Sequence, residues 1–205
     1  SYRVVEREPV VSQYHDMTIT SAAPPSSGGV VLAEILNMLS HYPLGEMDTV
    51  NRVHVVVEAM RRAYRDRAAY LGDPDFVEMP LERLLNQDYA AGLVQSIRLD
   101  RATLSESLSP VTAGKPQGQD TTHFSILDAD GNRVAATLSV NYPFGACFVP
   151  PGTGVLLNNE MDDFSARPGT PNVYGLVGAE ANAIAPGKRM LSSMSPSFFE
   201  DSDRM

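Results

Sequence analysis

Apolar residues recur at two different spacings along the chain, one spacing in each half. In the first half, apolar residues at helical intervals over 31–39 follow the turn-rich segment 24–29, which predicts a helix capped by Ser26 or Ser27. A longer helix is predicted from its N-cap Asp48 to the Gly and Pro at 72–74, and a third around 88–97. We expect the long helix to bury an apolar stripe and to turn its charged i,i+4 pairs toward water. The stripe consists of Val50, Val53, Val57, Met60 and Tyr64, and the pairs are Glu58–Arg62 and Arg62–Asp66.

The second half has the period of two that is typical of β-strands. Residues 122–128 alternate in polarity and contain many β-branched side chains, which predicts a strand. Asp130 and Gly131 tolerate positive φ, so we expect a hairpin turn there and a partner strand over 134–140. Residues 105–118 are rich in Ser, Pro and Gly and predict an exposed linker. Residues 149–188 predict ordered loops, the usual place for binding residues.

The composition is that of a folded globular protein with an acidic surface. The chain has 205 residues, of which 43% are apolar and 20% charged, and its formal net charge is −9. Such a surface repels phosphate backbones and anionic lipid, which argues against nucleic acid and membrane surfaces as partners. The sequence has no run of 18 apolar residues, so we expect no membrane segment in it. Both ends resemble cuts through a longer polypeptide.

The sequence gives little support to metal or thiol chemistry. The four histidines are scattered, without the close spacing of a metal site, so we expect no metal. The single cysteine, Cys147, excludes an intrachain disulfide framework and a CxxC redox pair. Because it lies between Ala146 and Phe148, we expect Cys147 to be a small buried hydrophobe.

A threonine at the start of the predicted hairpin offers a different chemistry. Thr121 follows Asp120 where the linker meets the first strand. A threonine hydroxyl is a weak nucleophile, but cleavage just before Thr121 would free an α-amine that can activate the hydroxyl of the same residue. A flexible segment leading into a strand suits such self-cleavage. Taken alone, the pattern favours an ordinary strand that begins with two threonines.

Longer stretches of the sequence closely resemble the gamma-glutamyltranspeptidases. They are PPSSGGVVLAEILNML and YRDRAAYLGDPDFV in the first half, and TTHFSILDADGNRVAATLSVNYPFG, LLNNEMDDFSA and PGKRMLSSMSP in the second. The resemblance implies an α+β fold, the four-layer αββα sandwich of the N-terminal nucleophile hydrolases. It also implies a precursor that cuts itself between Asp120 and Thr121. Residues 1–120 would then be the C-terminal part of the large subunit and residues 121–205 the N-terminal part of the small, catalytic subunit.

The resemblance also assigns roles to single residues. Thr121 matches the nucleophile, and its freed α-amine matches the general base. Ser139 matches a hydroxyl that hydrogen-bonds the nucleophile and aids processing, although most members have Thr there. Two carboxylates suit a cationic ligand. The residues that hold the substrate α-amino group are matched by Asn141, Glu160 and Asp163. The residues that bind its α-carboxylate are matched by Ser192 and Ser193. The lid loop is matched by residues 168–179, which include Tyr174.

The function implied is γ-glutamyl transfer from glutathione and related compounds to water or to amino-acid and dipeptide acceptors. The implied enzyme is periplasmic or extracellular and uses no metal or organic cofactor. The oxyanion-hole glycines and an arginine for the α-carboxylate are expected in the remainder of the two subunits, so residues 1–205 alone should be a poor catalyst.

Two alternatives stay open. One is a cephalosporin (glutaryl) acylase of the same fold, against which Glu160 and Asp163 argue, because a glutaryl group has no α-amine for them to hold. The other is an unprocessed precursor or binding module without catalysis.

Overall fold

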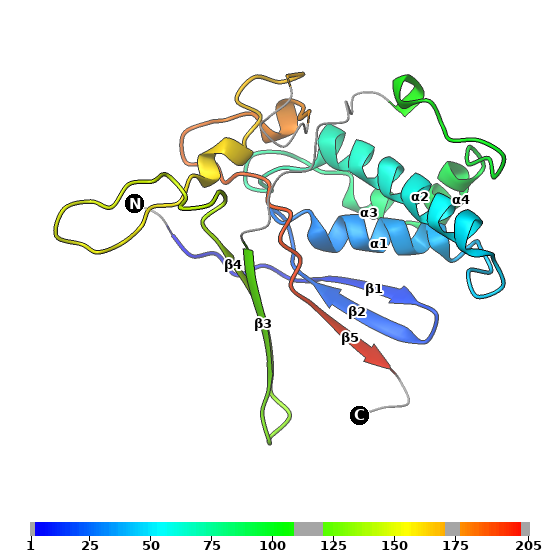
Figure 1. Ribbon diagram of the computed structural model, residues 1–205, viewed down its shortest axis with the longest axis horizontal. Coiled ribbons are helices and arrows are strands. Elements are labelled where there is room, and N and C mark those ends of the chain that lie inside the picture. Colours follow the sequence, from blue (N-terminus) through cyan, green and yellow to red (C-terminus); the bar gives the residue numbers. More distant parts are fainter. Residues whose placement is uncertain (1–2, 109–120, 171–176, 202–205) are drawn as a thin grey trace.

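The computed structural model describes residues 3–108, 121–170 and 177–201, which form helices and two small antiparallel sheets (Figure 1). The helices are α1 (Gly28–Leu39), α2 (Thr49–Tyr70), α3 (Leu81–Leu84) and α4 (Gln87–Val94), with 3₁₀ turns η1 (Ser105–Leu108), η2 (Glu160–Asp163) and η3 (Glu180–Asn182). The strands are β1 (Val10–Tyr14), β2 (Met17–Ser21), β3 (Thr121–Leu127), β4 (Arg133–Ser139) and β5 (Ser197–Asp201). Within these ranges, no helix combines the length and apolar character that crossing a membrane requires.

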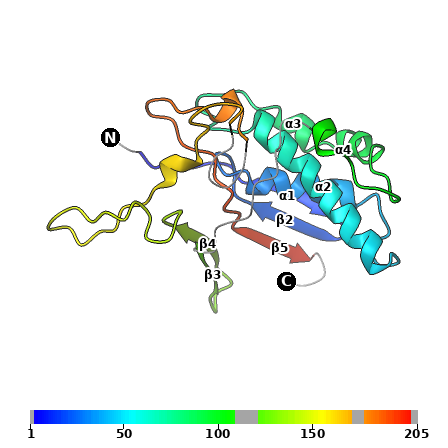
Figure 2. The ribbon, with the colours of Figure 1, turned by 45° about the horizontal axis from the view of Figure 1, so that its top comes forward.

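A three-stranded sheet joins the first and last described parts of the chain. Its central strand, β2, pairs with β1 from Val10↔Ser21 to Tyr14↔Met17, and with β5 along its other edge. Helix α1 contacts β1 and β2, and Figure 2 shows the helical layer on one side of this sheet. The sequence pattern predicts none of these three strands, so the helical interpretation of the first half is incomplete.

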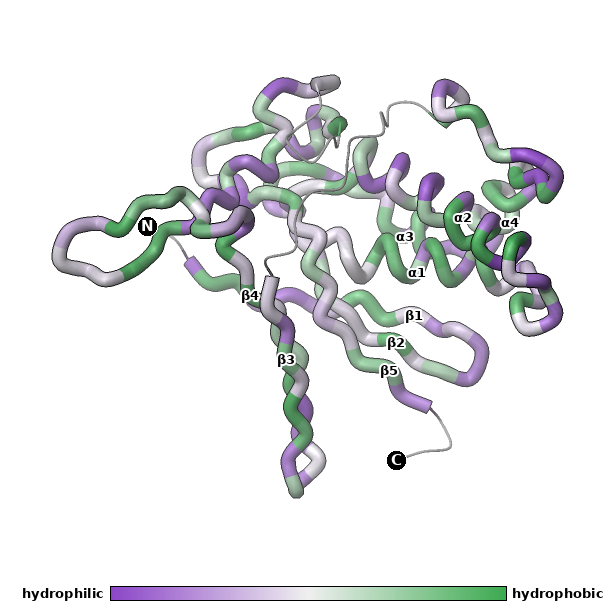
Figure 3. Tube along the Cα trace, in the orientation of Figure 1, coloured by the Kyte–Doolittle hydropathy of each residue, from purple (hydrophilic) through white to green (hydrophobic). Residues whose placement is uncertain are grey.

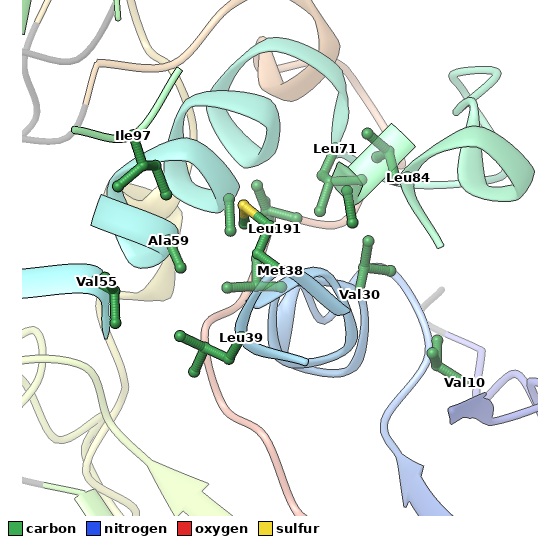
Figure 4. Packing of buried hydrophobic residues seen from close by; sticks show 13 residues of the cluster. Val10, Val30, Met38, Leu39, Val55, Ala59, Leu71, Leu84, Ile97 and Leu191 are labelled. Atoms are coloured by element: carbon green, nitrogen blue, oxygen red, sulfur yellow. The ribbon is translucent and has the colours of Figure 1, made fainter. Parts of the chain in front are cut away.

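The hydrophobic core lies among the helices, and one residue of the second half reaches into it (Figure 4). Met38 of α1, Ala59 of α2 and Leu84 of α3 are fully buried there. Leu191 packs against the same cluster, with 3% of its surface exposed. The core therefore anchors the segment that carries Ser192 and Ser193.

The helix boundaries follow the predicted signals. The Asp48 carboxylate caps α2 by accepting a hydrogen bond from the backbone N–H of Asn51 at 3.0 Å, and α2 ends at Tyr70, just before Gly72. At the start of α1, the Ser26 hydroxyl accepts from the N–H of Gly28 at 3.1 Å. Ser27 directly precedes α1, but its side chain makes no capping bond. The predicted third helix is confirmed as α4.

The predicted orientation of α2 is wrong. Val50 is 78% exposed and Met60 is 42% exposed, whereas Glu58, Arg62 and Asp66 are each at most 2% exposed. Charged side chains can be buried when every charge is paired and hydrogen-bonded, and these meet that condition. The Glu58 carboxylate accepts a bond of 2.6 Å from Arg62, and the Arg62 guanidinium also donates to Ser96.

The buried charges of α2 also hold the chain that follows α4. Glu58 accepts the backbone N–H of Thr103 at 3.1 Å as well as the Thr103 hydroxyl. Burial raises the pKa of Glu58, but the hydrogen bonds from Thr103 and Arg62 outweigh it and lower this pKa to about 2. The predicted partner of Asp66 is also wrong, because Asp66 accepts bonds from Arg65 at 2.9 Å and from Tyr89 at 2.7 Å.

The predicted hairpin is confirmed, and it extends away from the helical layer (Figure 1). The Asp128 carboxylate closes its turn by accepting the N–H groups of Asp130 and Asn132, and Gly131 has a φ of +84°. Apolar and polar positions alternate along β3 and β4 in Figure 3, and apolar side chains such as Leu127 and Leu138 are exposed.

These elements agree with the predicted α+β class, and the four-layer arrangement stays a prediction. Residues 105–108 of the predicted linker form η1, and the rest of it, 109–118, lies outside the described residues. Outside η2 and η3, the described part of 149–188 contains no named helix or strand, as predicted. The expectation for Cys147 is wrong, because its turn carries a φ of +53° and leaves the side chain exposed.

Candidate functional site

The hairpin places the predicted nucleophile beside its predicted hydroxyl partner. Thr121, the first residue of β3, is the register partner of Ser139, the last residue of β4. Opposed residues of an antiparallel pair hold their side chains on the same face of the sheet. The Thr121 hydroxyl donates to Ser139 Oγ at 3.5 Å, a long hydrogen bond, and Thr121 is exposed. The nucleophile candidate is therefore accessible and already aimed at a second hydroxyl.

Ser139 in turn contacts the first predicted substrate-binding residue. The backbone N–H of Asn141 donates to Ser139 Oγ at 2.9 Å, and Asn141 has a φ of +73°. Asparagine tolerates this left-handed conformation better than most side chains, which fits the sharp turn that ends β4. The Asn141 side-chain amide donates to the carbonyl of Asn159 at 3.1 Å, so the end of the hairpin is bonded to the loop before η2.

Asn159 organises this junction, although neither the sequence pattern nor the family resemblance assigns it a role. Its side-chain oxygen accepts the N–H of Tyr142 at 3.0 Å, and its backbone N–H donates to Val140 at 3.2 Å. Its side-chain amide also donates to Asp162 at 2.9 Å. The signal that could have identified it is the pair Asn158-Asn159 directly before an acidic turn, since Asn side chains commonly satisfy backbone groups in turns.

The two predicted ammonium-binding carboxylates lie on one 3₁₀ turn, η2. Burial, and after it the neighbouring Glu160, raise the pKa of Asp163 to about 6, while Arg67 acts in the opposite direction. Burial also raises the pKa of Glu160. The Asn182 side chain fixes this turn by donating to the carbonyl of Asp163 at 2.8 Å. Half-buried carboxyls with raised pKa values mark a candidate functional site, and a cation bound beside them would favour their ionised forms.

The two predicted carboxylate-binding serines lie against the start of α1. Ser192 forms a bridge with Ser26, and its carbonyl accepts both the N–H and the hydroxyl of Ser27 at 2.8 Å. Ser193 accepts a bond of 2.8 Å from Nη2 of Arg67, whose Nε donates to Ser27 at 2.9 Å. The sequence pattern assigns Arg67 no role. A buried arginine cannot be distinguished by periodicity from the exposed ones on the same helix.

The predicted residues thus form two sets. Thr121, Ser139 and Asn141 are linked by contacts, and Asn159 connects them to η2. Ser192 and Ser193 are held by Ser27 and Arg67. The positive charge of Arg67 also lowers the pKa of Asp163, which links this set to η2. An open hollow of about 420 Å³ has Ser193, Tyr64 and His123 among its lining residues. Tyr174 and Asp120 lie outside the described residues.

The chemistry available to this arrangement is that of hydroxyls, carboxyls and one guanidinium. Within residues 3–108, 121–170 and 177–201, no group of three His, Cys, Asp or Glu side chains is placed to hold a metal ion. An exposed hydroxyl can act as a nucleophile when a base is beside it, a carboxyl pair can accept a cation, and a serine pair supported by a guanidinium can donate to an anion.

Comparison with known proteins gives consistent matches over the whole chain. The family model described as Gamma-glutamyltranspeptidase matches residues 1–205. A glutathione hydrolase proenzyme of Pseudomonas sp. (strain A14) is 51% identical over 199 residues, which cover 95% of this chain and 34% of that protein. The glutathione hydrolase proenzyme of Escherichia coli (strain K12) is 44% identical over 198 residues, which cover 96% of this chain and 34% of that protein.

A solved structure resembles the fold. The crystal structure of a cephalosporin acylase from Bacillus halodurans has a TM-score of 0.73 and 28% sequence identity, covering 96% of this chain and 33% of that one. The chain therefore spans about a third of the length of the proteins that it matches.

Proposed function

Because the chain belongs to the gamma-glutamyltranspeptidase family, we propose that it supplies the catalytic threonine and donor-binding residues of a longer proenzyme that removes γ-glutamyl groups from glutathione and related compounds. The acceptor is water in hydrolysis and an amino acid or dipeptide in transpeptidation. The observation that carries the proposal is the pairing of Thr121 with Ser139 at the head of the hairpin, in a chain whose relatives are named glutathione hydrolase proenzymes.

The first chemical step is self-cleavage between Asp120 and Thr121. The Thr121 hydroxyl attacks the carbonyl carbon of Asp120, and the peptide C–N bond breaks as the nitrogen takes up a proton. The chain is then joined through an ester, which water hydrolyses to leave a carboxylate on Asp120 and a free α-amine on Thr121. The contact between Thr121 and Ser139, at 3.5 Å, supports this step because it orients the attacking hydroxyl.

The second reaction is acyl transfer by the processed enzyme. The α-amine of Thr121, with an ordinary pKa of about 8, removes the proton from the hydroxyl of the same residue. That hydroxyl attacks the γ-carbonyl of the donor, and the proton passes to the leaving amine as the C–N bond breaks. Water or an acceptor amine then attacks the γ-glutamyl ester and restores Thr121. This scheme needs no metal or organic cofactor.

The donor is recognised as a zwitterion. Asp163, with Glu160 and Asn141, receives the α-ammonium group, and this cation would oppose the effect of burial and Glu160, which raise the pKa of Asp163. Ser192 and Ser193 receive the α-carboxylate. Tyr174 and the lid of 168–179 close over the donor in this proposal.

A glutaryl acylase is the second candidate, and the similarity to the cephalosporin acylase of Bacillus halodurans favours it. Glutaryl and γ-glutamyl p-nitroanilides, compared at equal concentrations, separate the two, because only the second donor carries an α-amine. We expect kcat/KM to be higher for the γ-glutamyl compound.

The deciding experiment concerns processing. Intact mass and N-terminal sequencing of the proenzyme should show two chains, one of which begins Thr-Thr-His-Phe. The same preparation should hydrolyse γ-glutamyl p-nitroanilide. Thr121→Ala should remain one chain and inactive. A wild-type protein that folds but stays a single inactive chain would support the non-catalytic precursor or binding module instead.

A further inference from the structure

We propose that Arg67 is a positioning residue for the donor's α-carboxylate and acts through the hydroxyl of Ser193. The inference rests on the proposed function, because it concerns the carboxylate that Ser192 and Ser193 receive there. It assigns part of that recognition to the long helix α2, which carries none of the residues predicted to bind the donor.

The Arg67 guanidinium is placed where one side chain can fix several parts of the site. Arg67 is only 8% exposed and lies in the last turn of α2. Its Nε donates to Ser27 at 2.9 Å and its Nη2 donates to Ser193 at 2.8 Å. The Ser27 hydroxyl also donates to the carbonyl of Ser192. The guanidinium therefore holds Ser193 directly and Ser192 through Ser27.

Hydrogen-bond polarity determines what Ser193 can do next. A guanidinium has only donors, so the Ser193 oxygen must act as the acceptor in their contact. The hydroxyl hydrogen of Ser193 is then directed away from Arg67 and is available to an acceptor on the opposite side. Ser193 lines the open hollow, so an anionic group placed there would accept this hydrogen.

The charge of Arg67 favours the same kind of ligand. Its side-chain hydrogen bonds within the described part of the chain go to the neutral hydroxyls of Ser27 and Ser193. The Tyr64 ring lies 5.9 Å from it, and Asp163 acts on it through its charge, without a salt bridge among the described residues. Burial lowers the pKa of Arg67, and Tyr64 and Asp163 offset this only in part. A buried cation gains most from an anion that approaches its hydrogen-bonded hydroxyls. The chemical class that fits is a carboxylate.

The test compares two donors in the proenzyme after processing. One is γ-glutamyl p-nitroanilide, and the other is 4-aminobutyryl p-nitroanilide, which keeps the amine and lacks only the α-carboxylate. Arg67→Gln should lower kcat/KM for the γ-glutamyl donor about 10- to 100-fold, mainly through KM, and change it less than about twofold for the other donor. Arg67→Lys should restore part of the loss because it keeps the charge.

A neighbouring arginine provides the matched control. Arg65 lies on the same helix but donates to Asp66 and Tyr89, so Arg65→Gln should leave the ratio of the two donors unchanged. If Arg67→Gln fails to fold or to cleave, Ser27→Ala removes one anchor of the guanidinium and should produce a smaller loss that is again confined to the γ-glutamyl donor.

The two possible failures are distinguishable. Equal losses on both donors in Arg67→Gln and Ser27→Ala would overturn the inference and show a purely structural role. A wild-type enzyme that does not prefer the γ-glutamyl donor over the 4-aminobutyryl donor would instead overturn the proposed function.

Discussion

Thr121 and Ser139 face each other across the open end of the β3–β4 hairpin, with their hydroxyl oxygens 3.5 Å apart. Seven register pairs run from this contact to Leu127↔Arg133, so the distance depends on the whole ladder rather than on one side chain. Ser139 also accepts the N–H of Asn141, which fixes the direction of its own hydroxyl. The turn at Asp128 and Gly131 therefore determines which residue stands beside the nucleophile.

Ser139→Ala should slow self-cleavage between Asp120 and Thr121. Loss of one neutral hydrogen bond typically removes about 1 kcal/mol, so the rate should fall roughly 3- to 10-fold. Ser139→Thr keeps the hydroxyl and should cleave at nearly the wild-type rate. A time course of chain cleavage on denaturing gels measures both, and equal rates for Ala and wild type would remove Ser139 from the processing step.

Asp163 should add a second acidic step to the pH profile, below the step that the Thr121 α-amine produces at its ordinary pKa of about 8. Burial and the neighbouring Glu160 raise the pKa of Asp163 to about 6, so Asp163 becomes neutral as the pH falls through 6 and no longer attracts an ammonium group. kcat/KM for γ-glutamyl p-nitroanilide, which reports the free enzyme, should therefore fall more steeply below pH 6 than between pH 6 and 8. Asp163→Asn should remove only the extra steepness below pH 6 and lower kcat/KM at pH 8 about 10- to 100-fold.

The glutaryl donor is the control for Asp163, because it has no α-amine. Its kcat/KM should change much less in Asp163→Asn. Equal losses on both donors would mean that Asp163 supports the fold of η2, where Asn182 already bonds its carbonyl, and not the ligand.

The local elements were predictable from sequence, and the long-range sheet was not. The β3–β4 hairpin depends on alternation and on a turn within one short segment, so its pattern is complete in the sequence. The β1–β2–β5 sheet requires Ser21 to meet Ser197, and five-residue strands of this kind carry too little pattern to be distinguished from loops.

The site followed the same division. Thr121, Glu160 and Asp163 could be placed from the resemblance, since each lies in a continuous motif. The role proposed for Arg67 could not, because it rests on contacts with Ser27 and Ser193, which belong to distant segments. The inverted face of α2 has a related cause: periodicity predicts that charged residues face water, and only the tertiary partners of Glu58 and Arg62 show that they are buried.

The pair of Glu58 and Arg62 should be important for stability. Arg62→Met leaves a buried carboxylate without its buried cationic partner and should lower the free energy of unfolding by about 3–5 kcal/mol. Arg61→Gln removes a 25% exposed partner of the same carboxylate and should cost about 1 kcal/mol or less. Urea unfolding of both variants at pH 7 measures the difference, and equal costs would contradict a special role for the buried pair.

The pH dependence of Glu58 has a defined direction. Its pKa falls from 4.5 to about 2 on folding, so its contribution is fully present above pH 4.5 and is lost as the pH falls toward 2. The stability difference between wild type and Glu58→Gln should therefore shrink below pH 4.5. A difference that stays constant from pH 7 to pH 3 would show that ionisation of Glu58 contributes nothing.

The last prediction concerns two buried carboxyls in the helical layer, Glu34 and Asp66, each 1% exposed. Burial and the adjacent Asp66 raise the pKa of Glu34 to about 9, while Arg65 and Arg83 act against this shift. Neither carboxyl oxygen of Glu34 meets a hydrogen-bond donor within the described residues. A proton on Glu34 supplies the missing donor, because it can be shared with the Asp66 carboxylate. The folded protein therefore holds Glu34 neutral at pH 7.

Between pH 4.5 and 9 the folded state keeps this proton, whereas the unfolded chain releases it. The free energy of unfolding should therefore fall as the pH rises through this range, by up to about 1.4 kcal/mol per pH unit. Glu34→Gln carries a permanent N–H donor toward Asp66 and has no such slope. Its unfolding midpoint relative to wild type should thus rise steadily from pH 5 to pH 8. The exposed Glu78→Gln is the matched control and should show a constant offset. Parallel curves for Glu34→Gln and wild type would mean that Glu34 is already ionised in the folded protein, with a partner that compensates its charge.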